Sequence, residues 1–212
     1  MNRDAQESEG TKKTVLFADL CSSTSIIEEL IRSENQQRWR RVLENLDRFL
    51  IAWSAVDEFE LYKFIGDGWV LLFEPAFSDV KLLSLMHALC KRYQKVFDRV
   101  VKPVLSTDVG NVGITFGLDR GALIPVEMNS RKEYIGRPLN VAARLQAAIK
   151  DKDKEPQGKV LMSNSAYEKM RASIVGKYKV WPRVTRNLRN ISGGEHYQAK
   201  KVRVFPEVEQ ES

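Results

Sequence analysis

The apolar positions of the chain follow two spacings, one that predicts strands and one that predicts helices. Residues 13–20 form a nearly continuous apolar run, and two shorter runs flank Gly66-Asp67-Gly68, a sequence that favours a tight β-turn. Apolar residues recur at helical intervals in several longer segments, with a wide apolar face over residues 36–53. The pattern therefore predicts strands and helices in mixed order.

The predicted strands are 13–20, 58–65, 69–73, 109–119, 121–126, 160–162 and a final pair within 180–204 that breaks at Gly193-Gly194. The predicted helices are 26–31, capped by Ser22, Ser23 and Thr24, then 36–53, 78–101, 137–150 and 163–172. Because hairpins are interspersed with helices, the order favours an α+β fold with an antiparallel sheet and helices on one of its faces. One domain of residues 13–204 is expected, between a disordered leader (1–12) and a short tail (205–212).

The composition is that of a soluble protein: of 212 residues, 29% are charged and 43% are hydrophobic, with a net charge of +6. No apolar stretch reaches the roughly 18 residues that a membrane span needs, and residues 1–11 lack a signal-peptide core, so a cytoplasmic protein without membrane association is expected. Cys21 and Cys90 are too few for a disulfide framework and are expected to be reduced thiols. Because basic residues are interspersed with acidic ones, no nucleic-acid partner is expected.

Two acidic residues stand at the ends of predicted strands. Asp19 ends the first apolar run, and Asp67 lies at the tip of the predicted hairpin. Taken alone, an Asp in either place is more often a helix cap or a turn former. Two convergent carboxylates, however, are a common way to hold divalent cations for phosphoryl chemistry. The residues around them favour that role, because a helix start follows Asp19 and suits a polyphosphate, while glycines beside Asp67 let a ligand approach the backbone.

A third string, EYIGRPLNVAARL at residues 133–145, places Asn140 and Arg144 one turn apart on the same face of a predicted helix. Together, the Phe17-Ala18-Asp19 strand, the Gly66-Asp67 hairpin and the Asn140 and Arg144 pair resemble, in order and spacing, the motifs of class III nucleotidyl cyclase catalytic domains. The resemblance covers about residues 13–204. It implies a ferredoxin-like α+β domain with a mostly antiparallel sheet, and an enzyme that converts a nucleoside triphosphate to a 3′,5′-cyclic nucleotide and pyrophosphate.

The resemblance also assigns roles to individual residues. It implies that Asp19, Asp67 and the carbonyl of Leu20 bind two divalent cations, Mg²⁺ or Mn²⁺. Asn140 would orient the ribose, and Arg144 would balance charge on the α-phosphoryl group. The implied triphosphate contacts are the backbone amides of Cys21, Ser22, Ser23 and Thr24, with Arg189 as a further contact in a loop that departs from the family pattern. Because the family places the metal aspartates and the Asn–Arg pair on different subunits, the resemblance implies a homodimer with two shared active sites.

Lys63 and Glu133 stand where the family reads the nucleobase. Lys63 disfavours guanine, because guanylyl cyclases typically have a carboxylate at its position. Glu133 is one methylene longer than the aspartate typical of adenylyl cyclases, which suits a smaller base, so UTP or CTP is the favoured substrate and ATP is the alternative. A simple ion pair between Lys63 and Glu133 is a further interpretation.

The short chain also resembles the stand-alone cyclases of bacterial Pycsar anti-phage systems. That resemblance implies a second messenger, cUMP or cCMP, read by a separate effector protein, with control from outside the chain. Two other classes of function stay open: a non-catalytic cyclase-like module that binds nucleoside triphosphate, and a nucleic-acid binder. The second rests on net charge alone and leaves the spacing of the motif residues unexplained.

Overall fold

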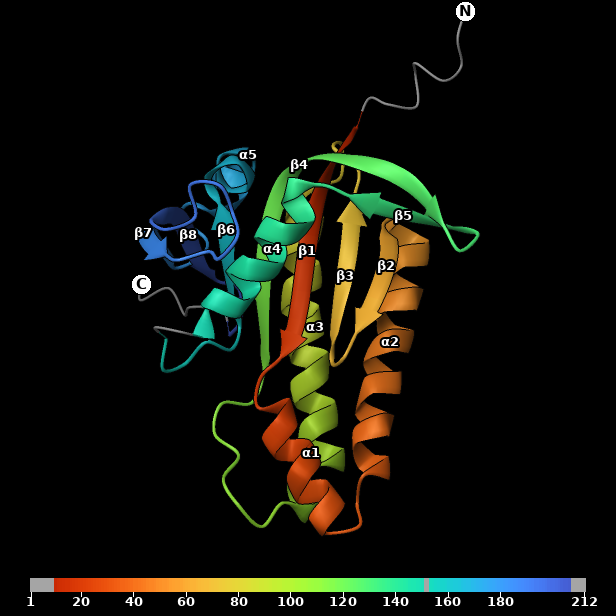
Figure 1. Cartoon of the computed structure of the whole chain (residues 1–212). Helices are drawn as coiled ribbons and strands as arrows, with labels where there is room; N and C mark the ends of the chain where they lie inside the picture. Colours follow the sequence, from red (N-terminus) through yellow and green to blue (C-terminus); the bar gives the residue numbers. More distant parts are fainter. Residues whose placement is uncertain (1–9, 151–152, 207–212) are drawn as a thin grey trace, which may run out of the picture.

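One sheet runs through the described part of the chain, residues 10–150 and 153–206 (Figure 1). In this computed structural model the sheet has eight strands in the order β2-β3-β1-β4-β6-β8-β7, with β5 paired to β4 outside that path. Neighbouring strands are antiparallel except β4 and β6, which are parallel. The arrangement confirms the predicted α+β class and its mostly antiparallel sheet.

The strands are β1 (Thr11–Leu20), β2 (Glu60–Ile65), β3 (Gly68–Phe73), β4 (Ile114–Met128), β5 (Arg131–Ile135), β6 (Lys159–Ser163), β7 (Val180–Arg186) and β8 (Tyr197–Arg203). The helices are α1 (Ser23–Arg32), α2 (Gln37–Asp57), α3 (Asp79–Val100), α4 (Arg137–Ala148) and α5 (Asn164–Ile174). Most of the predicted elements are present within a few residues of their expected bounds.

One pair of predicted strands is wrong. The segments 109–119 and 121–126 are not two strands, because a single strand, β4, begins at Ile114 and runs unbroken through Gly121. The chain turns back only at residues 129–130 into β5, a strand that the pattern did not predict. Gly121 has a packing role: a Cβ there would lie 2.9 Å from Cγ of Pro138, at the start of α4. This glycine lets the helix approach the strand, a reason that the local sequence does not reveal.

The expectation of helices on one face is also wrong. Alternate residues of β1 point to opposite sides, with Leu16, Ala18 and Leu20 in the main core that α1, α2, α3 and α5 complete, and Val15 in a second cluster with Ala142 of α4 and Tyr134 of β5. Figure 1 shows α4 crossing in front of β1 and α3 behind the sheet. The chain must cross over between the parallel strands β4 and β6, and α4 supplies part of that crossover on the second face.

The predicted leader (1–12) and tail (205–212) fall largely outside the described residues. Where they are described they belong to the domain: Thr11 and Lys12 are part of β1, and the N–H of Phe205 donates to Gly158 O at 3.0 Å. The domain therefore extends past residues 13 and 204. Across residues 10–150 and 153–206, every helix is too short or too polar to span a bilayer.

The predicted cap of α1 is not formed by a side chain. Ser22 is the N-cap residue, but it adopts a left-handed conformation with φ 57° and its side chain makes no cap hydrogen bond. Its Oγ instead donates to Asn111 O at 2.7 Å, in the loop that precedes β4. A second link comes from Glu29 of α1, whose carboxylate accepts hydrogen bonds from the backbone N–H and the hydroxyl of both Ser106 and Thr107. Helix α1 is thus tied to the α3–β4 loop at two points.

Helix α4 lies directly on the backbone of β4 at Gly117. A Cβ on Gly117 would lie 2.0 Å from Ala142 O and 2.4 Å from the backbone N of Gln146, distances that no side chain tolerates. Only glycine allows the helix backbone to approach the strand this closely. The position of α4, and of every side chain it carries, therefore depends on this contact.

We expect Gly117→Ala to lower the free energy of unfolding by on the order of 3 kcal/mol, because either α4 or β4 must move to admit the methyl group. Urea denaturation followed by circular dichroism measures the loss. Ala147→Ser, on the exposed face of the same helix, is the matched control and should unfold like the parent protein. Equal midpoints for all three proteins would contradict the close packing.

The four hydrogen bonds to Glu29, led by the one from the Thr107 hydroxyl, lower the pKa of this carboxyl from 4.5 to about 2. An acid with a lowered folded-state pKa stabilises the fold above its unfolded pKa and loses that contribution as the pH falls through the folded value. The difference in melting temperature between the parent protein and Glu29→Gln should therefore be largest above pH 4.5 and shrink towards about pH 2. Glu28→Gln, an exposed neighbour, serves as the control, and a difference that is constant over this range would refute the assignment.

Candidate active site

The structure brings the two predicted metal carboxylates together. In the antiparallel pairing of β1 with β3, Asp19 lies opposite Gly68, the residue that follows Asp67. A Cβ on Gly68 would lie 2.6 Å from Ala18 O and 3.3 Å from Oδ1 of Asp19, so the hairpin tip rests directly on the end of β1. Gly66, with φ +66°, makes the turn that sets Asp67 beside this junction. Sequence spacing predicted the hairpin, and the sheet register brings it to Asp19.

The electrostatics of Asp67 reflect this crowding. Burial raises the pKa of its carboxyl above the ordinary value, a hydrogen bond with Ser23 acts in the opposite direction, and the negative charge of Asp19 raises the pKa further. Lys150 partly offsets the repulsion between the two carboxylates. A half-buried pair of like charges of this kind is stabilised by a cation.

Two residues that sequence analysis missed complete the surroundings of Asp19. Nε2 of Gln146 donates to Asp19 Oδ2 at 2.9 Å and to Oγ1 of Thr115 at 3.0 Å. Nζ of Lys150 lies 2.9 Å from Asp19 Oδ2 and 3.5 Å from Leu20 O. Gln146 is a polar residue on the otherwise apolar buried face of α4, and that exception in the pattern is the sequence feature by which it could have been found.

The neighbours of Lys150 favour the charged form of its amine. Burial alone would lower the pKa of its ammonium, but the hydrogen bond and charge of Asp19, with Cys21 and Asp67 nearby, raise the pKa above the ordinary value. An ammonium therefore occupies a position beside two of the predicted metal-binding groups.

The donor atoms fit hard divalent cations. Asp19, Asp67 and the carbonyl of Leu20 offer only oxygen, which Mg²⁺ and Mn²⁺ prefer. Within residues 10–150 and 153–206 no group of three or more His, Cys, Asp or Glu side chains is placed to hold a metal. Two carboxylates suffice for Mg²⁺, which usually keeps several waters and takes further oxygens from substrate phosphates. The contact of the Lys150 ammonium with Asp19 and Leu20 shows that these oxygens accept a cation.

The β1–α1 loop is predicted to bind phosphates, but one of its backbone N–H groups already donates a hydrogen bond within the chain. The backbone N–H of Cys21 donates to Gly113 O at 2.9 Å, so this amide is not available to a triphosphate and its assignment is corrected. The thiol of Cys21 is buried, which raises its pKa to about 11. The remaining predicted amides, those of Ser22, Ser23 and Thr24, lie at the start of α1, where the first N–H groups have no acceptor within the helix.

Asn140 and Arg144 do not join this cluster. Both side chains are exposed on the outer face of α4, on the side opposite Val141, Ala142 and Leu145, which face the sheet. Among the described residues neither makes a side-chain hydrogen bond or an ion pair. The predicted spacing on one helical face is confirmed, and that face points away from the chain's own core.

Lys63 and Glu133 contact each other. Nζ of Lys63 lies 2.6 Å from Glu133 Oε2, and the hydroxyl of Tyr62 donates to the same oxygen at 2.5 Å. The hydrogen bond from Lys63 is the main reason why the pKa of Glu133 lies below its ordinary value. The β4–β5 hairpin brings Glu133 to β2, because Tyr62 and Tyr134 pack edge to face with ring centroids 5.4 Å apart. The ion pair considered from the sequence is therefore present.

Arg189 lies in the loop between β7 and β8, and its side chain is exposed. Its neighbour Leu188 is buried against Leu145 and Ala148 of α4, so the loop rests on the same helix that carries Arg144. The turn is closed by Gly194, whose N–H donates to Ile191 O at 2.8 Å. No contact of Arg189 with the Asp19 cluster is seen in the described residues.

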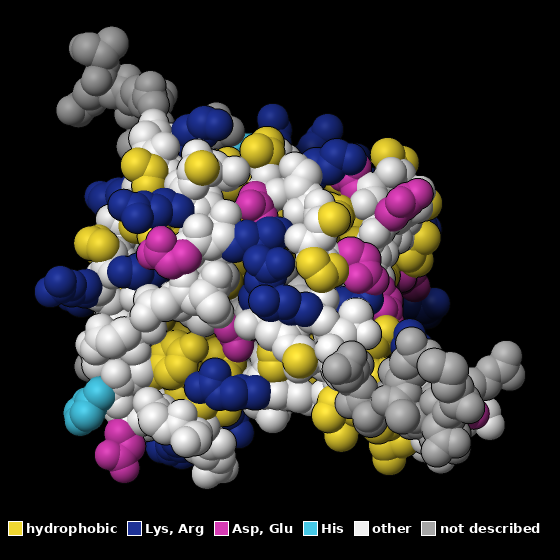
Figure 2. All heavy atoms as spheres, turned by 90° about the horizontal axis from the view of Figure 1, so that it is seen from above, with side chains coloured by type: hydrophobic (Ala, Val, Ile, Leu, Met, Phe, Trp, Pro, Cys, Tyr) yellow, Lys and Arg dark blue, Asp and Glu magenta, His cyan; other side chains and the backbone are white. Residues whose placement is uncertain are grey.

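Basic side chains are dispersed over the face that Figure 2 shows. Lys and Arg lie between acidic and apolar side chains there and do not form a continuous stripe on the described part of this face. A phosphate backbone laid across it would meet carboxylates as well as ammonium and guanidinium groups, which weakens it as a nucleic-acid surface.

Comparison with solved structures identifies the fold as that of the class III cyclase catalytic domain. The adenylyl cyclase CyaB from P. aeruginosa superposes with a TM-score of 0.67 at 20% identity, over 90% of this chain and 93% of that one. The guanylyl cyclase Cya2 gives a TM-score of 0.67 at 17% identity, over 96% and 98% of the two chains. The guanylate cyclase domain of RhGC from Catenaria anguillulae, solved in complex with GTP, gives 0.60 at 17% identity, over 92% and 97%. No protein-family model matches the sequence, and comparison with curated proteins gives no match.

Proposed function

We propose that the protein is a nucleotidyl cyclase that converts a nucleoside triphosphate to a 3′,5′-cyclic nucleotide and pyrophosphate. The observation that carries this proposal is the junction of Asp19 with the Gly66-Asp67 hairpin tip on a cyclase fold. Degenerate cyclase domains generally lose a metal aspartate or the arginine, and this chain has Asp19, Asp67 and Arg144. A non-catalytic nucleotide-binding module is therefore the weaker candidate.

The chain's own groups can be assigned to the steps of this reaction. Divalent cations held by Asp19, Asp67 and the Leu20 carbonyl would neutralise the triphosphate and favour ionisation of the ribose 3′-hydroxyl. The amides of Ser22, Ser23 and Thr24, at the positive end of α1, bind the β- and γ-phosphates, which leave as pyrophosphate. Asn140 orients the ribose so that its 3′-oxygen faces the α-phosphorus. Arg144 stabilises the charge that develops on the α-phosphoryl oxygens, and Arg189 adds a further phosphate contact.

The site requires two copies of the chain. Asn140 and Arg144 are on the exposed face of α4, whereas Asp19 lies beneath the buried face of the same helix, near Gln146 and Lys150. One chain therefore presents its two half-sites on opposite sides of α4. A head-to-tail homodimer, in which each copy supplies Asn140 and Arg144 to the carboxylates of the other, completes two equivalent sites.

The nucleobase is read by the preformed Lys63 and Glu133 pair. Both Lys63 and Tyr62 contact Oε2 of Glu133, which leaves Oε1 to accept a hydrogen bond from the base, while the Lys63 ammonium keeps donors for a base carbonyl or ring nitrogen. Cytosine and uracil present such a donor next to an acceptor, so UTP or CTP is the proposed substrate. ATP is the second candidate, because adenine presents the same pair and adenylyl cyclases are among the structural neighbours.

A cyclic pyrimidine nucleotide would act as a second messenger for a separate effector protein, as in anti-phage signalling.

Incubation of the purified protein with each of the four nucleoside triphosphates and Mn²⁺ tests the function. We expect release of pyrophosphate and one dominant cyclic nucleotide, identified by mass spectrometry, with cUMP or cCMP as the main product. Asp67→Asn should reduce the rate by about a thousandfold or more, since a lost charge-stabilising group costs 10²–10³ and the carboxylate is a metal ligand. Binding of triphosphate without any pyrophosphate would support the non-catalytic module, and cAMP as the main product would reject the pyrimidine assignment.

Shared sites predict that two inactive variants restore each other. A mixture of Asp67→Ala and Arg144→Ala proteins should recover about a quarter of the parent activity, because half of the randomly formed dimers are mixed and each mixed dimer has one intact site. Subunit exchange is measured independently by fluorescence transfer between labelled copies. Full exchange without recovered activity contradicts a site built from two chains, and each variant alone should stay inactive at every concentration.

A further inference from the structure

Lys150 occupies the place where a cation is needed. Its Nζ lies 2.9 Å from Asp19 Oδ2 and 3.5 Å from Leu20 O, and these two groups are among the oxygens assigned to the divalent ions. The Lys150 side chain is 40% exposed and that of Asp19 27% exposed, so the contact lies at the edge of the site and is accessible to ions from solvent. A monovalent ammonium and a divalent ion cannot both occupy this position, because both need the same oxygen atoms.

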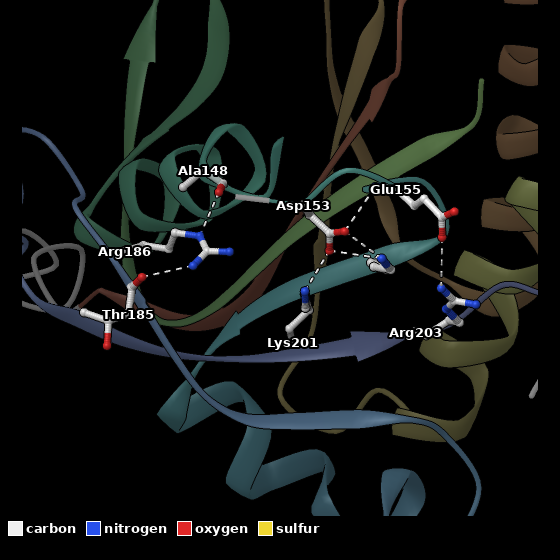
Figure 3. A network of polar contacts seen from close by, with 8 residues as sticks. Ala148, Asp153, Glu155, Thr185, Arg186, Lys201 and Arg203 are labelled. Carbon is white, nitrogen blue, oxygen red and sulfur yellow. Dashed lines mark hydrogen bonds and ion pairs between the residues drawn. The ribbon is translucent and has the colours of Figure 1, made fainter. Parts of the chain in front are cut away.

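Polar contacts hold the chain at Ala148, shortly before Lys150, and at Asp153 and Glu155, which follow it in the sequence (Figure 3). Before it, Nε of Arg186 on β7 donates to Ala148 O at 2.9 Å. After it, Asp153 accepts from Lys201 Nζ at 2.7 Å and from Lys159 Nζ at 2.9 Å, and Arg203 lies 3.8 Å from Glu155 in the same segment. The Lys150 side chain is long and flexible, so its ammonium can leave Asp19 while Ala148 stays bonded to Arg186.

The charges favour an exchange. Asp19 and Asp67 together carry two negative charges near each other, and Lys150 compensates one of them when no metal is bound. A divalent ion compensates both, and it binds the carboxylate more strongly than an ammonium does because of its higher charge and its direct coordination. Once released, the Lys150 ammonium would be free to pair with the phosphates that a triphosphate brings to the same ions.

We propose that Lys150 is a built-in counter-ion that holds the cation position between Asp19 and Leu20 and must be displaced before a divalent ion binds there. This inference rests on the proposed function for its meaning, since it assigns Lys150 the role of setting how much metal the enzyme needs. In the absence of nucleotide, Lys150 competes with the metal ion for Asp19 and Leu20. After metal and nucleotide have bound, its ammonium pairs with the triphosphate.

The affinity for Mn²⁺ without nucleotide, measured from the electron paramagnetic resonance signal of the free ion, tests the proposal. Lys150→Met removes the charge and keeps an apolar stem of similar length, and it should bind Mn²⁺ roughly twofold to fivefold more tightly, the factor expected for a partly exposed ion pair. Lys150→Arg keeps the charge and should bind no more tightly than the parent protein. Lys154→Met removes an exposed charge four residues away and is the matched control, with parent affinity expected.

A second measurement uses the unmodified protein. Brief acetylation with peptide mass spectrometry should show that Mn²⁺ increases the labelling of the Lys150 amine, because the ion frees it from Asp19, while labelling of Lys154 stays unchanged. Equal or weaker Mn²⁺ binding by Lys150→Met, or unchanged Lys150 labelling on saturation with Mn²⁺, would overturn the proposal. Failure of both the parent protein and Lys150→Met to bind Mn²⁺ would overturn it as well.

These outcomes are separate from the test of the proposed function. Displacement of Lys150 by Mn²⁺ without formation of a cyclic nucleotide would keep the counter-ion and reject the cyclase. Cyclic nucleotide formation with the same Mn²⁺ affinity in the parent protein and in Lys150→Met would keep the cyclase and reject the counter-ion.

Discussion

The close contact between α4 and β4 at Gly117 is the constraint on which the candidate site depends. Because the helix backbone rests on the strand with no side chain between them, the residues on its buried face reach the end of β1. Gln146 on that face, and Lys150 two residues past the end of the helix, then meet Asp19, while the opposite face leaves Asn140 and Arg144 in solvent. A bulkier residue at position 117 would disturb both faces together.

This geometry gives one helix two tasks. The amide of Gln146 on its buried face and the ammonium of Lys150, just past its C-terminal end, contact Asp19. Its exposed face carries the groups proposed to act on a substrate held by another copy of the chain. If Lys150 leaves Asp19 when a metal binds, Gln146 remains the contact between α4 and this carboxylate.

The sequence pattern predicted correctly those features that depend on contacts between residues close together in the chain. The Gly66-Asp67-Gly68 turn, the helical spacing of Asn140 and Arg144, and most strands and helices follow from apolar period and turn chemistry, which neighbouring residues determine. The predictions were wrong where a residue far along the chain determines the local structure or occupies a hydrogen-bonding group. The pattern divided residues 109–126 into two strands at position 120, but β4 continues through Gly121, where Pro138 of α4 packs against it. The family resemblance implied a phosphate contact for the N–H of Cys21, but Gly113 O, from a loop far along the chain, accepts it.

The sequence by itself determined which side chains the candidate site has: two carboxylates at strand ends, an Asn and Arg pair on one helical face, and the Lys and Glu proposed to read the base. Only the tertiary structure decided how they are combined. The register of β1 against β3 joined Asp19 to the hairpin of Asp67, the β4–β5 hairpin set Glu133 on Lys63, and the placement of α4 turned Arg144 outwards and Lys150 onto Asp19. These outcomes depend on long-range backbone packing, which residue spacing along the chain does not encode.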